Sequence, residues 1–259
     1  LSSDFSLKFV SDLLNLIQGG TSMGQQTFEF LLLAMSALAV IVFVALYYVR
    51  AGYGMFHTPK WGLSVNNKLG WVLMEAPVFL VIFFLLFELH YFQRSFIFPF
   101  LMKGKSRMPL AIMLMGVVFN VLNGLMQGEW LFYLAPEGLY TDAWLSTSSF
   151  WLGVILFFIG MGINLHSDSV IRHLRKPGDT RHYLPQKGMY RYVTSGNYFG
   201  ELVEWIGFAV LTCSPAAWVF VLWTFANLAP RANSIRNRYR EEFGKDAVGK
   251  KKRMIPFIY

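Results

Sequence analysis

The sequence contains little charge for its length. Of its 259 residues, 15% are charged and 55% are hydrophobic, and the mean hydropathy is +0.43. Soluble domains carry about 25% charged residues, so this chain cannot cover a water-facing surface. Its apolar composition also excludes an intrinsically disordered chain. The composition therefore indicates an integral membrane protein.

Cysteine and the common nucleotide and metal motifs are also scarce. The single Cys213 excludes an intramolecular disulfide and a cysteine-based zinc or iron–sulfur site. No GxGxxG or P-loop pattern occurs, which argues against a Rossmann domain or a P-loop nucleotide site. The histidines have no HExxH-type spacing, so we expect no metal site. We also expect no nucleic-acid partner.

Several hydrophobic blocks are long enough to cross a bilayer, which takes about 20 apolar residues. These blocks are residues 28–49, 71–101, 108–127, 144–165 and 198–229. The last block is interrupted at Ser214 and Pro215, and because proline cannot continue a helix, we expect two helices there. Residues 5–17 place apolar side chains at helical spacing, so residues 1–27 are predicted to form an amphipathic interfacial segment.

Loop charges predict the direction in which the chain crosses the membrane. Basic residues dominate residues 103–107, residues 166–192 and the tail after residue 229, so these parts are expected on the cytoplasmic side. Residues 129–143 contain acids and no base, and they are expected outside. Residues 50–70 are again basic and cytoplasmic by this rule. The charges therefore predict seven helices, with the N-terminus outside and the C-terminus in the cytoplasm.

For the block at residues 71–101, the loop charges and the length of the block indicate different numbers of crossings. Cytoplasmic segments on both sides require two crossings, but the block is short for two ordinary spans at about 1.5 Å per residue. We favour two short helices with a tight reversal near residues 82–88. Residues missing from this stretch, or one long span with residues 50–70 outside, are the alternatives.

Charged side chains inside the predicted spans are candidates for function. They are Glu29, Glu75, Glu88, Arg94, Glu201 and Glu204. We interpret Glu29 and Arg94 as interfacial anchors, because long charged side chains near span ends reach the headgroups. Glu75 has apolar neighbours on both sides, and burial would keep it protonated and able to donate a hydrogen bond. A hydrogen bond between packed helices is the simpler alternative for Glu75.

A polar helix face begins at the end of the block at 144–165. Asn164, Asp168, Arg172 and Arg175 are spaced so that they share one face, which extends from the membrane edge into the cytoplasm. Arginine side chains are suited to bidentate phosphate contacts. The alternatives are a local ion pair between Asp168 and Arg172 and an ordinary basic loop.

Several strings of this sequence resemble the steroid 5α-reductase family. They are AGYG (51–54), the MEAP turn around Glu75, LHYFQRSFIFPF (89–100), NGLMQG (123–128), GMGINLHSDSVIRHLRKPGD (160–179), YVTSGNYFGELVEWIGFA (192–209) and the final IPFIY. They follow the order of the family and cover nearly all of the chain after residue 50. The resemblance implies an NADPH-dependent enzyme that reduces the 4,5 double bond of 3-oxo-Δ4 steroids. It also implies a single all-α transmembrane domain over residues 1–259, with about seven helices enclosing cofactor and steroid.

The resemblance assigns roles to individual residues. Glu75 and Tyr91 would be catalytic and would polarise the steroid 3-oxo group while a hydride reaches C5. The residues that would line the steroid are Trp71, Phe119 and Trp205. The cofactor-binding positions would be Tyr53, Lys103, Lys105, Asn164, Asp168, Arg172, Arg175, Asn197, Glu201, Arg231 and Tyr239, most of them within residues 160–259.

The predicted catalytic pair makes a geometric demand. On one unbroken helix Glu75 and Tyr91 would lie about 24 Å apart, so their joint action requires the reversal that the loop charges indicate. Other functions compatible with the sequence are reduction of another conjugated or polyprenyl lipid, and lipid binding or transport without catalysis. We expect a multi-pass protein of a bacterial inner membrane or the endoplasmic reticulum, acting as a monomer without an obligate protein partner.

Overall fold

The computed structural model describes residues 22–53, 56, 58–81, 85–102, 107–175, 179 and 181–259. The predicted amphipathic stretch at residues 5–17 lies outside the described residues, as do Lys103 and Lys105. The α-helices are α2 (Gln25–Tyr48), α3 (Asn67–Val81), α4 (Leu85–Phe92), α5 (Phe98–Leu101), α6 (Leu110–Glu129), α7 (Ser148–Arg172), α8 (Gly196–Thr212), α9 (Pro215–Phe243) and α10 (Lys245–Val248). The other elements are η2 (Pro59–Trp61), β1 (Ser64–Asn66), η3 (Gln93–Ile97), β2 (Arg107–Pro109), η4 (Trp130–Leu134), η5 (Trp144–Ser146) and η6 (Gly188–Arg191).

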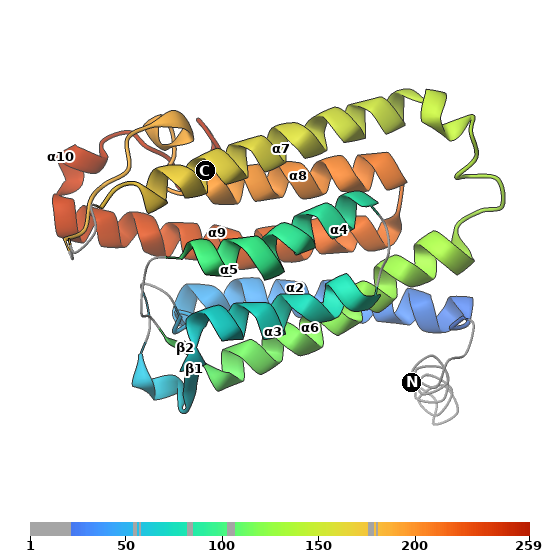
Figure 1. The fold of residues 1–259 in the computed structure, drawn as a ribbon, viewed down its shortest axis with the longest axis horizontal. Coiled ribbons are helices and arrows are strands. Elements are labelled where there is room, and N and C mark those ends of the chain that lie inside the picture. Colours follow the sequence, from blue (N-terminus) through green and yellow to red (C-terminus); the bar gives the residue numbers. More distant parts are fainter. Residues whose placement is uncertain are drawn as a thin grey trace.

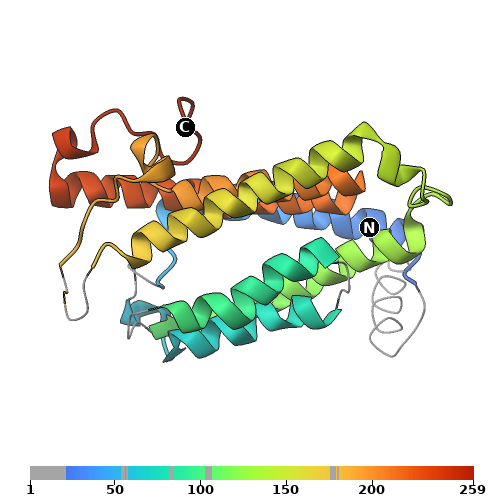
Figure 2. The same ribbon diagram turned by 45° about the horizontal axis from the view of Figure 1, so that its top comes forward.

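The long helices lie roughly along one direction and form two layers. Helices α7, α8 and α9 make up one layer, and α2 packs along α9 (Figure 1). Helices α3, α4, α5 and α6 make up the other layer, which is separated from the first in the turned view (Figure 2). The expectation of a helical membrane protein is thus confirmed for the main body of the described chain.

A small β-ribbon is the exception to the predicted all-α fold. Strands β1 and β2 pair antiparallel, with Ser64 opposite Pro109 and Asn66 opposite Arg107. Each strand directly precedes a helix, and Pro109 favours extended backbone at the residue before it. The ribbon therefore ties the start of α3 to the start of α6.

Within the described residues, three helical segments are long and apolar enough to cross a membrane: Gln25–Tyr48, Leu110–Leu134 and Ser148–Arg172. Their outward faces expose large apolar side chains such as Leu33 and Trp151, as expected where lipid is the solvent. Helices α3, α4 and α8 have fewer than the 18 residues taken here as the minimum for a span, and the second half of α9 is charged. The number of crossings and their direction therefore remain predictions.

The chain reverses between α3 and α4, as predicted. Helix α3 ends at Val81 and α4 begins at Leu85, and the segments η3 and α5 then pack back along α3 (Figure 1). After α4 the helix widens to a π-helical turn at η3, where the Phe98 N–H donates a hydrogen bond to the Gln93 carbonyl. Pro99 follows directly, and because proline has no N–H to bond the carbonyl four residues earlier, regular α geometry cannot continue through this point.

Helices α7 and α8 are in backbone contact. A Cβ added at Gly160 would lie 2.2 Å from the Glu204 nitrogen, and one added at Gly200 would lie 2.4 Å from the Asn164 nitrogen. Small residues at a crossing allow membrane helices to approach this closely. The glycines therefore fix the polar end of α7 directly against the start of α8.

The predicted break between α8 and α9 is confirmed. Helix α8 ends at Thr212, and Cys213 adopts the left-handed conformation with a φ of 51°. Ser214 then caps α9 by accepting a hydrogen bond from the Ala217 N–H at 3.2 Å, and Pro215 occupies the first turn. The two helices thus form a tight hairpin at the Ser214–Pro215 position.

Candidate functional site

The close contact of α7 and α8 brings three of the predicted cofactor residues together. Asn197 at the start of α8 donates from Nδ2 to Asp168 Oδ1 at 3.1 Å. Asn164 donates from Nδ2 to the Asn197 carbonyl at 3.0 Å. Asn164 and Asp168 are both buried, on the face of α7 that also contains Gly160. The helix face predicted from spacing is therefore the face that packs against α8.

The remaining polar groups of this region fit an anionic, amide-bearing ligand. Asp168 Oδ2 and Arg172 Nη1 are buried, and neither atom has a hydrogen-bond partner among the described residues. The Ser167 and Ser195 hydroxyls beside them are also unpartnered within the described part. Buried polar atoms are normally hydrogen-bonded, so such a cluster is typical of a site completed by a ligand. A carboxylate suits an amide N–H, and an arginine suits a phosphate.

A second group of predicted cofactor residues meets where the segment after α2 crosses α9. The Arg231 guanidinium lies 3.9 Å from the ring centroid of Tyr53, and its Nε donates to the Tyr198 hydroxyl at 2.7 Å. Tyr239 is buried about two turns further along α9. By contrast, Arg175 is exposed just beyond the end of α7. Arg231 is therefore already held in place, whereas Arg175 extends from the edge of the site.

The predicted catalytic residues converge on Asn120 of α6. Asn120 donates from Nδ2 to Glu75 Oε2 at 3.2 Å, and its Oδ1 accepts from the Tyr91 hydroxyl at 3.4 Å. Glu75 lies on α3 and Tyr91 on α4, so the reversal between these helices brings both residues to one amide. The geometric demand of the predicted pair is thus met in the structure.

Aromatic side chains surround Tyr91. The buried Trp205 ring lies 5.9 Å from the Tyr91 ring, measured between centroids, and 4.6 Å from Phe220. Phe119 approaches the other side of Phe220 at 6.1 Å, so two of the three predicted steroid-lining residues share this cluster. Trp71 lies elsewhere, with its ring 6.2 Å from that of Tyr53. Trp71 therefore borders the predicted cofactor residues.

Comparison with known proteins agrees with this arrangement. A family profile described as 3-oxo-5-alpha-steroid 4-dehydrogenase matches residues 106–259. The chain is 36% identical to the Bos taurus 3-oxo-5-alpha-steroid 4-dehydrogenase 1, covering 86% of this chain and 93% of the relative. It is 34% identical to the Gossypium hirsutum steroid 5-alpha-reductase DET2 (91% and 98%) and 35% identical to the Homo sapiens 3-oxo-5-alpha-steroid 4-dehydrogenase 2 (86% and 94%). The chain belongs to the 3-oxo-5-alpha-steroid 4-dehydrogenase family. It is therefore an oxidoreductase of the steroid 5α-reductase type.

Arg94 is a central residue in this 5α-reductase family member, and the interpretation as an interfacial anchor was wrong. Its guanidinium lies 4.9 Å from the ring centroid of Trp71, and Nη1 lies 3.9 Å from Asp168 Oδ2. It is also close enough to Glu75 and Glu201 for electrostatic interaction. Glu201 occupies the same side of α8 as Asn197, one turn later. Arg94 thus connects the predicted catalytic residues with the predicted cofactor residues.

The structure instead places Arg94 in a π-helical turn, with its guanidinium directed toward Trp71 and Asp168. In a regular helix its place near the end of a hydrophobic block suggests the membrane surface. The interruption at Pro99 was the available signal, since π turns are frequent at functional sites. Glu29, by contrast, is exposed and bonded to Gln25 at 2.9 Å, which agrees with a peripheral position.

A buried ion pair also connects the two layers of the family member. His90 Nδ1 on α4 lies 2.8 Å from Glu204 Oε1 on α8, and the side chains are 6% and 1% exposed. The His90 ring meets the Trp205 ring edge-on at 4.5 Å. The spacing of the histidines bears only on metal binding, and it does not predict this contact between histidine and carboxylate. The only hint of this contact in the sequence is that His90 and Glu204 directly precede the predicted site residues Tyr91 and Trp205.

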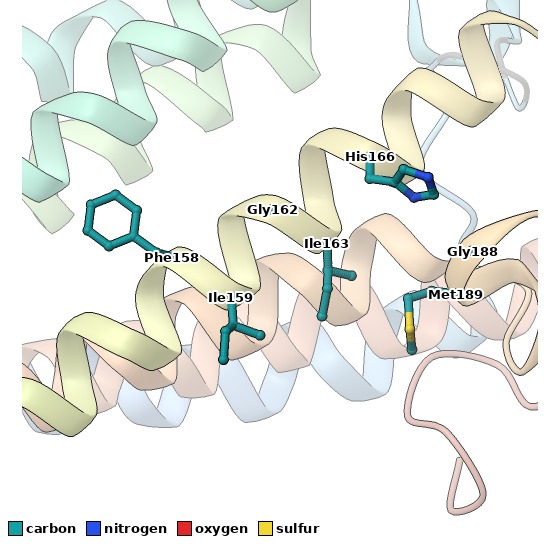
Figure 3. Close-up of a pocket in the computed structure, with 7 residues that line it drawn as sticks. All are labelled: Phe158, Ile159, Gly162, Ile163, His166, Gly188 and Met189. Carbon is teal, nitrogen blue, oxygen red and sulfur yellow. The ribbon is translucent and has the colours of Figure 1, made fainter.

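An open groove of about 480 Å³ lies on the other face of α7, away from these residues (Figure 3). It is lined by Phe158, Ile159, Gly162, Ile163, His166, Gly188 and Met189. These α7 residues face outward, whereas Asn164 and Asp168 are buried on the opposite side. On a helix apolar enough to span a membrane, such a face is expected to meet lipid. The groove is therefore separate from the candidate site.

Proposed function

We propose that this protein reduces the 4,5 double bond of 3-oxo-Δ4 steroids to 5α-dihydro steroids with NADPH. The observation that supports this most strongly is the meeting of Glu75 and Tyr91 at Asn120, although they come from different helices. The relatives are named as a steroid 5-alpha-reductase or as 3-oxo-5-alpha-steroid 4-dehydrogenases, which agrees with reduction of a steroid 4-ene. The family resemblance assigns roles to Glu75 and Tyr91, and their meeting at one amide adds a geometric argument for that assignment.

Glu75 and Tyr91 would act on the steroid 3-oxo group. When bound, NADPH would supply a hydride to C5 of the steroid, and a proton that then reaches C4 would complete the reduction. Negative charge develops on the 3-oxo oxygen as the hydride is added, and hydrogen-bond donors aimed at that oxygen stabilise the transition state more than the ground state. Tyr91 donates through its hydroxyl, and Glu75 donates when burial keeps it protonated. Trp205 and Phe119 would form the apolar wall against which the steroid rests.

The residues at the polar end of α7 would hold NADPH. Asp168, Asn164 and Asn197 would bind the nicotinamide end, where Asp168 Oδ2, which has no hydrogen-bond partner among the described residues, can accept from an amide. The three arginines Arg172, Arg175 and Arg231 would bind the phosphates. Tyr53, Glu201 and Tyr239 complete this side of the site, and Lys103 and Lys105 are proposed as weaker phosphate contacts. Arg94 would keep Asp168 and Trp71 in register.

The membrane arrangement follows from the loop charges. We propose seven crossings, with the N-terminus outside and the polar end of α7 and the C-terminus in the cytoplasm. NADPH would then enter from water, while the steroid would enter from the bilayer. A bacterial inner membrane and the endoplasmic reticulum both fit this orientation, and the protein would act as a monomer.

Turnover of the purified protein tests the proposal. In detergent or nanodiscs, incubation with NADPH and testosterone or progesterone should yield the 5α-dihydro steroid by chromatography. Replacing one oxyanion donor typically lowers kcat by about 10²- to 10³-fold, so Glu75→Leu and Tyr91→Phe should each fall in this range. Glu75→Gln keeps a weaker, neutral donor and should lie between Glu75→Leu and the wild type.

Matched controls exist just after α6, with Tyr133 in η4 and Glu137 in the loop that follows. Glu137→Gln and Tyr133→Phe make comparable changes at exposed positions and should leave kcat unchanged. If the folded wild type forms no 5α-dihydro steroid but reduces a polyprenyl or other conjugated lipid, the substrate class is wrong. If it binds steroid without oxidising NADPH, the protein is a binder or transporter and the proposed reaction is wrong.

A further inference from the structure

Asn120 has a well-defined orientation in the candidate site. Its Nδ2 donates to the Met74 carbonyl at 2.7 Å and to Glu75 Oε2 at 3.2 Å. A backbone carbonyl can only accept, so the NH₂ end of the amide must face α3, and Oδ1 must face Tyr91. The side chain is buried, being 4% exposed, and both its donor and its acceptor atoms are used. The amide therefore cannot flip without losing several bonds.

This orientation determines how a protonated Glu75 can be arranged. A protonated carboxyl has one oxygen that bears the hydrogen and one that accepts. Because Asn120 donates to Oε2, Oε2 is the accepting oxygen and the hydrogen belongs on Oε1. The free Oε1 is then the donor available to a ligand. Without Asn120, either oxygen could bear the hydrogen, and a share of the molecules would present an acceptor to the 3-oxo group.

The bond to Tyr91 is long and easily exchanged. Hydrogen bonds between a hydroxyl and an oxygen are usually about 2.7–2.8 Å long, whereas this one is 3.4 Å. The Tyr91 hydroxyl can therefore rotate from Asn120 Oδ1 to a better acceptor at little cost. Before a ligand binds, the packed ring fixes the position of the hydroxyl oxygen, and the contact with Asn120 orients its hydrogen.

We propose that Asn120 is a positioning residue that directs the Glu75 hydrogen to Oε1 and holds the Tyr91 hydroxyl ready for the same substrate oxygen. This inference rests on the proposed function, because it assigns Asn120 a part in that reaction. The two donors then meet one oxo group from two helices, and a third helix sets their relative orientation. Asn120 itself does not need to touch the steroid.

The simpler role for Asn120 is structural, since its bond to Met74 ties α6 to α3. The Asn120→Leu variant removes all three bonds at similar volume, and a matched Asn67→Leu variant controls for loss of a buried amide. Asn67 is 7% exposed in the same layer, and among the described residues its Nδ2 has one hydrogen bond, to the Met102 sulfur at 3.5 Å. For both variants, kcat is divided by the concentration of sites that bind NADPH. Protein that fails to fold is then not counted.

For Asn120→Leu we expect kcat per site to fall about 10- to 100-fold, less than for loss of a donor itself, with the steroid KM changed less than threefold. Asn67→Leu should retain the wild-type kcat per site. In a Tyr91→Phe background the fold-loss caused by Asn120→Leu should be smaller, because the hydroxyl that it positions is absent. A wild-type kcat per site for Asn120→Leu, or an equal loss in both backgrounds, would overturn the inference. Absence of product from the wild type would instead reject the proposed function.

Discussion

The contacts that hold the helices together within each of the two layers differ. In the α7–α8 layer, glycines bring the backbones themselves into contact, as at Gly160 and Gly200. In the α3–α6 layer, the site is joined through side-chain amides, and Asn120 spans α3, α4 and α6. Between the layers, the polar links include the His90–Glu204 and Arg94–Asp168 pairs. The proposed cofactor residues on α7 and α8 are thus held by contact between backbones. The proposed catalytic residues are held by side-chain hydrogen bonds, which can rearrange more easily.

The largest expected effect comes from breaking the glycine crossing. In Gly160→Ala the new methyl would lie 2.2 Å from the Glu204 nitrogen and 2.6 Å from the Gly200 carbonyl oxygen, and backbone atoms cannot move aside. We expect a loss of more than about 3 kcal/mol, the upper end of ordinary overpacking. Gly162→Ala on the same helix meets nothing within 4 Å, and it should be neutral or stabilise by up to about 1 kcal/mol. Thermal unfolding in detergent compares the two, and equal Tm values would contradict the backbone contact.

An intermediate effect is expected from breaking one link between the layers. Glu204→Leu leaves His90 buried without its partner, and removal of one member of a buried pair costs about 3 kcal/mol or slightly more. A double variant, His90→Phe with Glu204→Leu, replaces both groups by apolar ones and should recover most of the loss. Unfolding by denaturant measures this recovery. A double variant as unstable as the single one would show that packing, rather than the missing partner, causes the loss.

The smallest effect is expected in the exposed loop between α7 and α8. Hydrogen bonds from the Arg181 side chain and from the Tyr183 hydroxyl hold the pKa of Asp179 well below its ordinary value. A lowered folded-state pKa stabilises the fold above the unfolded pKa of about 3.9, and this stabilisation is lost as the pH falls through the folded value. Asp179→Asn should therefore lower Tm by about 1 °C at pH 7, and the difference should shrink below about pH 4. A difference that grows in acid would contradict this assignment.

The helical fold and much of the site could be predicted because their signals are local. The helix break at Ser214 and Pro215 follows from proline chemistry, and the shared face of Asn164 and Asp168 follows from helical spacing. The reversal before Tyr91 followed from loop charge together with the family resemblance. Each of these depends on a few neighbouring residues.

The features that were missed depend on contacts between distant segments. Asn120 became significant only once α3 and α4 were both known to lie against α6. Arg94 contacts Trp71 and Asp168, which lie far from it in the sequence, and Pro99 was the only local sign of its π-helical turn. The β-ribbon likewise needs residues 64–66 to meet residues 107–109. Spacing along the chain specifies helices and their faces, but it does not specify which faces meet.

The His90–Glu204 pair also affects how the molecule responds to membrane voltage. In its ion-paired form, with His90 protonated and Glu204 ionised, the pair as a unit has no net charge. Moving a full charge across a membrane involves about 2.3 kcal/mol per 100 mV, whereas a neutral pair experiences no net force from such a field. The connection between α4 and α8 would therefore be equally strong in an energised bacterial membrane and in an endoplasmic reticulum with little potential.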